Sequence, residues 1–175
     1  MKKQDTLENQ VNYAYLALGS NLGKKIINLE MAKYKLSKIG VIIIKTSCLY
    51  STKSWPNTKF PDFLNLILYV KTTLFLPELF KQIKLIEKSL GRKRAPKNYP
   101  RVCDIDIIDF NGTNSSIKLN SQKVMVPHMR MHERNFVLIP LYELNQNWMH
   151  PKFKINIVKL LSSLPNNELI TIKYS

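Results

Sequence analysis

The order in which two kinds of apolar spacing follow one another constrains the fold of this chain more than any other feature. Alternating apolar residues or β-branched runs predict strands, and apolar residues spaced three to four apart predict helices. By these criteria, strands are expected at Tyr13–Gly19, Val41–Tyr50, Phe63–Thr72 and Val102–Phe110. Helices are expected between them, over Ile26–Ile39 and from Pro77 to Gly91.

The resulting order of elements, strand, helix, strand, strand, helix, strand, is typical of one fold class. It is the βαββαβ order of ferredoxin-like α+β domains, in which a mainly antiparallel sheet carries its helices on one face. After this core we expect a hairpin over Asn111–Val126, a helix over Arg134–Leu144, and a last helix and strand between Ile155 and Tyr174. Pro140 is expected to end or bend the first of those helices.

The composition favours a single domain over the whole chain, with residues 1–12 as a polar N-terminal extension. Its 175 residues are 45% hydrophobic, which is enough to bury a core. No run approaches the roughly 20 apolar residues of a membrane span, and the polar N-terminus does not resemble a signal peptide, so a cytoplasmic protein is expected. Cys48 and Cys103 are too few for a disulfide framework and are expected to be buried free thiols. Thr52–Asp62 and Arg92–Pro100 are expected to be mobile loops.

The basic residues are distributed in two ways that predict different roles. The formal net charge of +15 would suit nucleic-acid binding, but the lysines are scattered from Lys2 to Lys173 and predict a solvated surface. All five arginines instead fall within one segment, as Arg92, Arg94, Arg101, Arg130 and Arg134. Because the planar guanidinium suits two-point recognition of phosphate, this segment is the first candidate for chemistry.

A pair of acids lies inside the last predicted strand of the core. Residues two apart in a strand point to the same face, so Asp104 and Asp106 direct both carboxylates at one spot. Such acids repel each other unless a cation lies between them, and magnesium is the usual cation beside a nucleotide. Together with the arginines of the preceding loop, the pair predicts a phosphoryl-transfer site. By the same alternation, Asp109 is expected on the opposite face and outside the site.

Three other positions are ambiguous on spacing alone. His128, which follows a proline, is as consistent with a capped turn as with a ligand. Glu87 stands at the edge of a predicted apolar stripe and is interpreted as a partly buried surface acid. The run Gly19–Gly23 resembles a glycine loop but lacks the lysine pattern of the Walker motif, so it is not interpreted as a phosphate-binding P-loop.

Four separated segments resemble the 6-hydroxymethyl-7,8-dihydropterin pyrophosphokinases of folate synthesis. They are Tyr15–Leu22 (YLALGSNL), Phe63–Asn65 (FLN), Pro100–Asp106 (PRVCDID) and the run Val126–Phe136, which contains VPH and HERNF. The similarity extends in order from about Tyr13 to Pro151. The chain departs from the family pattern at Lys97–Arg101, which is one residue shorter than the usual loop, and at Lys53–Trp55, which replaces a proline-rich start.

The resemblance implies transfer of pyrophosphate from ATP to the hydroxymethyl group of 6-hydroxymethyl-7,8-dihydropterin, with release of AMP. It implies two Mg²⁺ ions on Asp104 and Asp106 and catalytic roles for Arg92, Arg101, Asp104 and Asp106. Contacts with ATP are implied for Glu87, Arg92, Arg94, Arg101, His128 and Arg134. Contacts with the pterin are implied for Thr52, Trp55, Phe63, Asn65, Asp104 and Phe136.

Two other classes of protein are weighed against this interpretation. An RNA-binding module of the same topology would suit the charge, but the aromatic RNA-reading strand motif is missing, and paired acids would face its ligand. A metal-dependent nuclease or another phosphotransferase would use Asp104 and Asp106 but leave the pterin-site residues unexplained. The expected protein is therefore a monomer that binds ATP and a pterin, without nucleic-acid or membrane partners.

Overall fold

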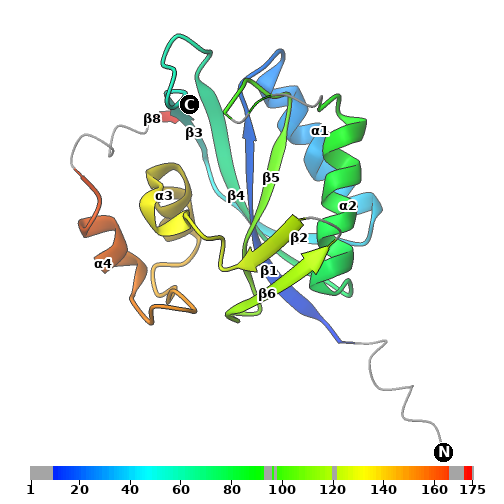
Figure 1. Cartoon of the computed structure of the whole chain (residues 1–175), viewed down its shortest axis with the longest axis vertical. Coiled ribbons are helices and arrows are strands. Elements are labelled where there is room, and N and C mark those ends of the chain that lie inside the picture. Colours follow the sequence, from blue (N-terminus) through cyan, green and yellow to red (C-terminus); the bar gives the residue numbers. More distant parts are fainter. Residues whose placement is uncertain (1–9, 93–95, 97, 120–121, 166–171, 175) are drawn as a thin grey trace, which may run out of the picture.

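The computed structural model describes residues 10–92, 96, 98–119, 122–165 and 172–174, which form an α+β arrangement (Figure 1). The first elements are β1 (Asn12–Ser20), α1 (Lys25–Lys38), β2 (Ile42–Thr46), β3 (Leu49–Thr52), β4 (Phe63–Thr72), α2 (Leu76–Ser89) and β5 (Asp104–Phe110). They are followed by β6 (Ser115–Leu119), β7 (Gln122–Val126), the 3-10 turn η1 (Met131–Glu133), α3 (Asn135–Leu144), α4 (Ile157–Ser162) and β8 (Ile172–Tyr174).

Six strands form the main sheet, in the order β5-β1-β4-β3-β8 with β2 also paired to β4. The pairings between these strands are antiparallel. The remaining two strands, β6 and β7, form a separate antiparallel hairpin. The predicted α+β class, the mainly antiparallel sheet, and the hairpin and helices that follow the core are thereby confirmed.

The single strand predicted over Val41–Tyr50 is wrong, because the chain breaks it into β2 and β3. At the break one backbone donor keeps a partner in β4 and the next turns to a side chain of α3. The N–H of Ser47 donates to the carbonyl of Ile67 at 2.9 Å, and that of Cys48 donates to the Glu143 carboxylate at 3.0 Å. Glu143 lies far along the chain in α3, so the strand pattern alone carries no sign of the break.

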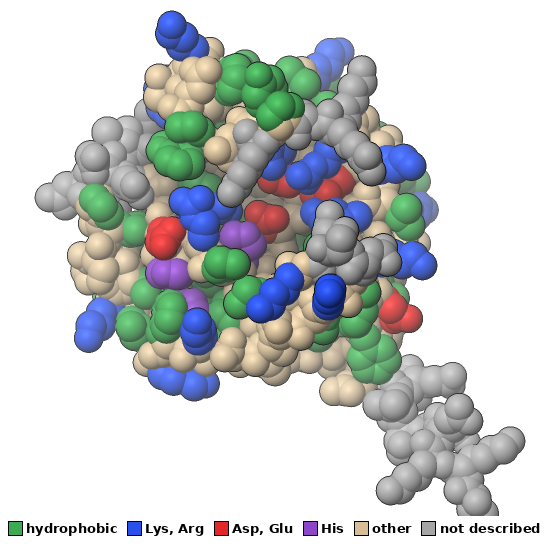
Figure 2. All heavy atoms as spheres, viewed as in Figure 1, with side chains coloured by type: hydrophobic (Ala, Val, Ile, Leu, Met, Phe, Trp, Pro, Cys, Tyr) green, Lys and Arg blue, Asp and Glu red, His purple; other side chains and the backbone are tan. Residues whose placement is uncertain are grey.

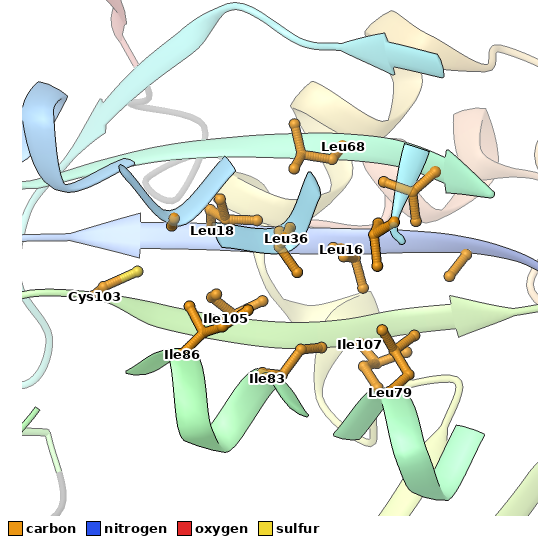
Figure 3. Close-up of a cluster of buried hydrophobic side chains, with 14 of the residues drawn as sticks. Leu16, Leu18, Leu36, Leu68, Leu79, Ile83, Ile86, Cys103, Ile105 and Ile107 are labelled. Atoms are coloured by element: carbon orange, nitrogen blue, oxygen red, sulfur yellow. The ribbon is translucent and has the colours of Figure 1, made fainter. Parts of the chain in front are cut away.

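Apolar side chains fill both faces of the main sheet. On one face, α1 and α2 cover a core that includes Leu16, Leu36, Ile83 and Ile105 (Figures 1 and 3). On the other face, α3 packs Leu138 and its neighbours against the sheet, and α4 packs behind α3. Near the Ser20 end of β1, the same face carries polar side chains, among them Asn65 and Asp104.

A β-bulge in β5 changes the face to which one acid points. Against β1, Asp106 pairs with Ala17 and Ile107 with Leu16, but Asp109 pairs with Tyr15, so the strand has one residue more than its partner. The prediction that Asp109 points away from Asp104 and Asp106 is therefore wrong. Asp109 is buried, and it accepts a hydrogen bond of 2.8 Å from the indole N–H of Trp148 in the core under α3.

Two smaller expectations are corrected by tertiary packing. Pro140 was expected to end or bend its helix, and the first of these outcomes is wrong, because α3 continues to Leu144 with Pro140 and Leu141 buried. Cys103 is buried as predicted, whereas Cys48 is only half-buried at the strand break. Among the described residues, no helix combines the length and the apolar character that crossing a membrane requires.

Candidate active site

The predicted acids meet three of the predicted arginines, Arg92, Arg101 and Arg134, at one end of the sheet. The register of three neighbouring strands places Asn65, Gly19 and Asp104 in one row, with Gly19 on the central strand. Figure 2 shows acidic, basic and histidine side chains gathered around a hollow in this face of the molecule. The site is therefore assembled from the ends of β1, β4 and β5 and the loops beside them.

Asp104 is held by two arginines. The guanidinium of Arg92 donates to Asp104 Oδ1 at 2.5 Å, and that of Arg101 donates to Oδ2 at 2.6 Å. Burial opposes the charge of Asp104, yet Arg101 and Arg92 outweigh it and lower the pKa of this carboxyl below its usual value. Asp104 therefore stays ionised and fixed in place.

Glu87, a buried acid of α2, holds Arg92 in this arrangement. Glu87 is 1% exposed and accepts hydrogen bonds from Arg92, from Lys84 at 2.9 Å and from the backbone N–H of Ile105 at 2.8 Å. Since β5 is an edge strand, the Ile105 N–H has no strand partner on that side, and Glu87 satisfies it. Burial raises the pKa of Glu87 against the opposing effect of Lys84. Glu87 thus orients Arg92 and is more buried than spacing alone predicted.

Asp106 has a looser environment. Its Oδ2 lies 3.7 Å from Arg134 Nη1 and 3.9 Å from His128 Nε2, and both distances are too long for a hydrogen bond. Burial lowers the pKa of His128, so its imidazole is neutral at pH 7. The backbone N–H of His128 donates to Ile108 O at 2.9 Å, which ties the turn to β5. Asp106 thus faces two donors across a gap.

The pterin residues implied by the resemblance occupy the neighbouring strand ends. Asn65 is buried and donates from its amide to Thr52 Oγ1 at 2.8 Å. A Cβ atom on Gly19 would lie 2.9 Å from Asn65 Oδ1 and 3.6 Å from the ring of Phe63, so a side chain at residue 19 would crowd both. A flat floor without a side chain therefore lies between Asn65 and Asp104.

Two aromatic residues of the predicted pterin site lie beneath arginines. Trp55 is 68% exposed, and the Arg130 guanidinium lies 5.7 Å from the centre of its ring. Phe136 is half-buried against the α3 core, with the Arg134 guanidinium 5.6 Å from its ring centre. Both arginines come from the turn that also carries His128. Arg94, which was predicted to contact ATP, lies outside the described residues.

The residues available to hold magnesium are few. Among the described residues, no group of three or more acidic, histidine or cysteine side chains is placed to hold a metal ion. Asp104 and Asp106 supply two carboxylates, and each Asp104 oxygen keeps a lone pair beyond its arginine contact. This donor set fits Mg²⁺, which binds to one or two carboxylates and takes its other ligands from water and substrate phosphates.

Sequence reasoning missed two polar residues at the site. Asn21 is buried and hydrogen-bonded to two segments, through Ser54 and Pro61 on one side and Arg101 on the other, although only its place in the Gly-Ser-Asn turn marked it. Lys84 reaches Glu87 from one helical turn away. Its spacing from Glu87 was a readable signal, because residues three apart on a helix are neighbours.

Comparisons with known proteins point to one family. Residues 15–146 match the model of the 7,8-dihydro-6-hydroxymethylpterin-pyrophosphokinase (HPPK) family. A 2-amino-4-hydroxy-6-hydroxymethyldihydropteridine pyrophosphokinase of Aquifex aeolicus is 38% identical over 140 residues, which are 80% of this chain and 84% of that protein. The folic acid synthesis protein fol1 of Pneumocystis carinii is 33% identical over 97% of this chain, which spans only 22% of that relative's length.

The fold is shared with solved structures. A crystal structure of Plasmodium falciparum HPPK-DHPS superposes with a TM-score of 0.74 at 20% sequence identity. The similarity covers 89% of this chain and 44% of that one. This likeness supports the arrangement of the elements described above.

Proposed function

Because the chain belongs to the 7,8-dihydro-6-hydroxymethylpterin-pyrophosphokinase family, we propose that it transfers pyrophosphate from ATP to 6-hydroxymethyl-7,8-dihydropterin. The hydroxymethyl oxygen would attack the β-phosphorus of ATP, and AMP would leave. The observation that supports the proposal most strongly is the row formed by Asn65, Gly19 and Asp104, in which a pterin at Asn65 would lie beside a phosphate group at Asp104. A protein of the cytoplasm that acts as a monomer remains our expectation.

The phosphate subsite consists of arginines on both sides of the paired acids, with the neutral imidazole of His128 beside one of them. Arg92 and Arg101 approach from the loop before β5, and His128 and Arg134 approach from the turn after β7. A triphosphate placed between these groups would have its charge neutralised at both ends. Phosphoryl transfer depends on such positioning and neutralisation more than on covalent help from the protein.

Magnesium is part of the proposal. Asp104 and Asp106 would hold it, and bound Mg²⁺ would neutralise phosphate charge and orient the two reacting oxygens. The protein's own contribution is to keep Asp104 ionised and immobile through Arg92 and Arg101. Glu87 would act at one remove by orienting Arg92, and its expected contact with ATP stays a prediction.

The pterin subsite uses the flat floor at Gly19. Asn65 would hydrogen-bond the edge of the heterocycle, and its amide is already oriented by Thr52. Phe63 and Phe136 would take the two faces of the ring, because an aromatic slot suits a flat heterocycle. Trp55, which lies under Arg130 in this structure, would contribute from the rim of the site.

Product analysis tests the proposal. Purified protein with ATP, Mg²⁺ and 6-hydroxymethyl-7,8-dihydropterin is expected to release AMP and to form the pterin diphosphate. The matched control is 6-methyl-7,8-dihydropterin, which lacks the attacking hydroxyl and should give no AMP. Formation of ADP would indicate single-phosphate transfer, and AMP formed without any pterin would indicate hydrolysis, so either result would refute the proposal.

A further inference from the structure

The side chain of Asn21 links the walls of the site without belonging to either proposed subsite. Asn21 follows β1 directly and is 1% exposed. One wall is the segment that leads into β5 and carries Arg101. The other wall is the segment 53–62 between β3 and β4, which we call the rim loop.

The link to the first wall is a two-point contact with one residue. The backbone N–H of Arg101 donates to Asn21 Oδ1 at 2.7 Å, and the backbone N–H of Asn21 donates to the carbonyl of Arg101 at 3.2 Å. This pair of bonds fixes the backbone from which the Arg101 side chain reaches Asp104. The position of a phosphate-binding arginine thus depends on Asn21.

The link to the second wall uses the other end of the same amide. Asn21 Nδ2 lies 3.2 Å from Ser54 Oγ and 3.2 Å from the carbonyl of Pro61, and it donates to both. The Ser54 hydroxyl also donates to Pro61 O at 2.6 Å. Since Ser54 and Pro61 lie near opposite ends of the rim loop, Asn21 closes the base of that loop.

The chemistry of the amide makes this link specific to asparagine. One planar group supplies an acceptor to the first wall and two donors to the second, and no hydrogen-bonding atom of the side chain remains unused. Aspartate would keep the acceptor and lose both donors, and serine would be too short to serve both walls. Replacing Asn21 by aspartate should therefore keep the link to Arg101 and break the link to the rim loop.

We propose that Asn21 is a positioning residue that couples the phosphate subsite to the rim loop, so that ligand binding at either subsite strengthens binding at the other. The coupling part of this inference rests on the proposed function. A ligand that orders Arg101 also holds the Asn21 amide, and the ordered amide holds the rim loop beside the pterin floor. Because coupling of this kind is reciprocal, either ligand measures it.

A second contact between the same walls provides a comparison. The rings of Phe60 and Tyr99 are 5.5 Å apart, and Tyr99 is 48% exposed. An exposed aromatic contact is expected to carry less of the coupling than a buried amide with every bond satisfied. Tyr99→Leu therefore tests whether any contact between the walls is sufficient.

The experiment measures binding of α,β-methylene-ATP with Mg²⁺, and of 6-hydroxymethyl-7,8-dihydropterin, each alone and in the presence of the other. We expect the wild type to bind the pterin about 5-fold to 100-fold more tightly when the nucleotide is bound, the usual range of coupling between two sites. Asn21→Asp should bring this factor close to one. Asn57→Asp, an equal change of charge at an exposed residue of the rim loop, and Tyr99→Leu should each preserve most of it.

Hydrogen exchange of the ligand-free proteins tests the link independently of the reaction. Asn21→Asp should speed exchange in the rim loop while the Arg101 N–H stays protected, and Ser54→Ala should do the same to a smaller extent. Unchanged exchange in both variants, or an undiminished coupling factor in Asn21→Asp, would overturn the proposal. A wild-type protein that binds no pterin would refute the proposed function and the coupling, whereas the exchange result would still decide whether Asn21 positions the rim loop.

Discussion

Asp104 and Asp106 lie two residues apart on one strand, yet their surroundings differ. Asp104 accepts hydrogen bonds of 2.5 and 2.6 Å from two arginines, and one of these arginines is itself held by the buried Glu87. The Arg134 guanidinium lies 3.7 Å and the His128 imidazole 3.9 Å from Asp106, and among the described residues none donates a hydrogen bond to its side chain.

The difference shows that one half of the site is organised by the fold and the other half is left open. Functional groups that are fixed before a ligand arrives lose less freedom when it binds. Within the described part of the chain, no hydrogen bond competes for the oxygens of Asp106, so they are ready to accept a cation. Asp104 is thus held in place before a ligand arrives, whereas Asp106 is available to bind a cation.

The largest effects are expected from removing each carboxylate charge in turn. Asp106→Asn should lower kcat on the order of 10³-fold, because several kcal/mol of charge stabilisation are lost, and should leave stability almost unchanged. Asp104→Asn should lower kcat to a similar extent and also destabilise the fold, since Arg92 and Arg101 lose their partner. Steady-state assays together with thermal unfolding measure both quantities.

The control for this prediction is a third acid of the same strand. Asp109→Asn should keep kcat within about twofold, because Asp109 is buried in the core under α3, where it is hydrogen-bonded to Trp148. Equal stability losses in Asp104→Asn and Asp106→Asn would show that the two surroundings do not differ as described.

The next effect concerns Glu87, the buried acid that holds Arg92 beside Asp104. Glu87→Gln should lower the free energy of unfolding by about 3 kcal/mol, because breaking a buried ion pair leaves Arg92 without its buried carboxylate partner. Urea denaturation measures this change. The matched control is Glu30→Gln, which removes an exposed pair with Lys33 and should cost less than about 0.5 kcal/mol. Similar losses in the two variants would contradict a structural role for Glu87.

The smallest effect is a difference in how the two halves respond to acid in metal-free protein. The folded-state pKa of His128 lies below its ordinary value of 6.5, so below that pH the unfolded chain takes up a proton that the native state refuses, and stability falls. The pKa of Asp104 is also lowered, so its stabilisation is complete above 3.8 and is lost only as the pH falls through its folded-state pKa. Acid should therefore weaken the Asp106 half first.

Nuclear magnetic resonance in the presence of a chelator checks this order. The imidazole of His128 should titrate with a midpoint below 6.5, while Asp104 should remain ionised throughout that titration. The loss of stability between pH 7 and pH 5 should also be smaller in His128→Asn than in the wild type. A His128 midpoint above 6.5 would reverse the expected order.

Much of the fold could be predicted because its signals are local. The alternation of apolar residues over Phe63–Thr72 matches β4 residue for residue, and the apolar stripe of α2 is buried as expected. The break between β2 and β3 could not be predicted, because it depends on a hydrogen bond to Glu143 in another element. The error at Asp109 has the same origin, since a bulge is a property of strand pairing and leaves no trace in apolar spacing.

The site divides in the same way. The gathering of arginines beside Asp104 and Asp106 was predicted because these residues are neighbours in sequence or belong to a family motif. The roles of Glu87 and Asn21 were not, since each depends on segments that meet only in the folded protein. The expectation for Arg94 stays a prediction because that residue lies outside the described part of the chain.

Because of the bulge, the effect of deleting one residue from β5 should depend on which residue is deleted. Ile108 and Asp109 both face the α3 side, so a chain shortened by Ile108 would keep the remaining side chains of β5 on their present faces. A chain shortened by Ile105 would instead turn Asp106 into the apolar core under α1 and α2. The loss of a residue should therefore be tolerated better at Ile108 than at positions of β5 where the side chains alternate regularly between the two faces.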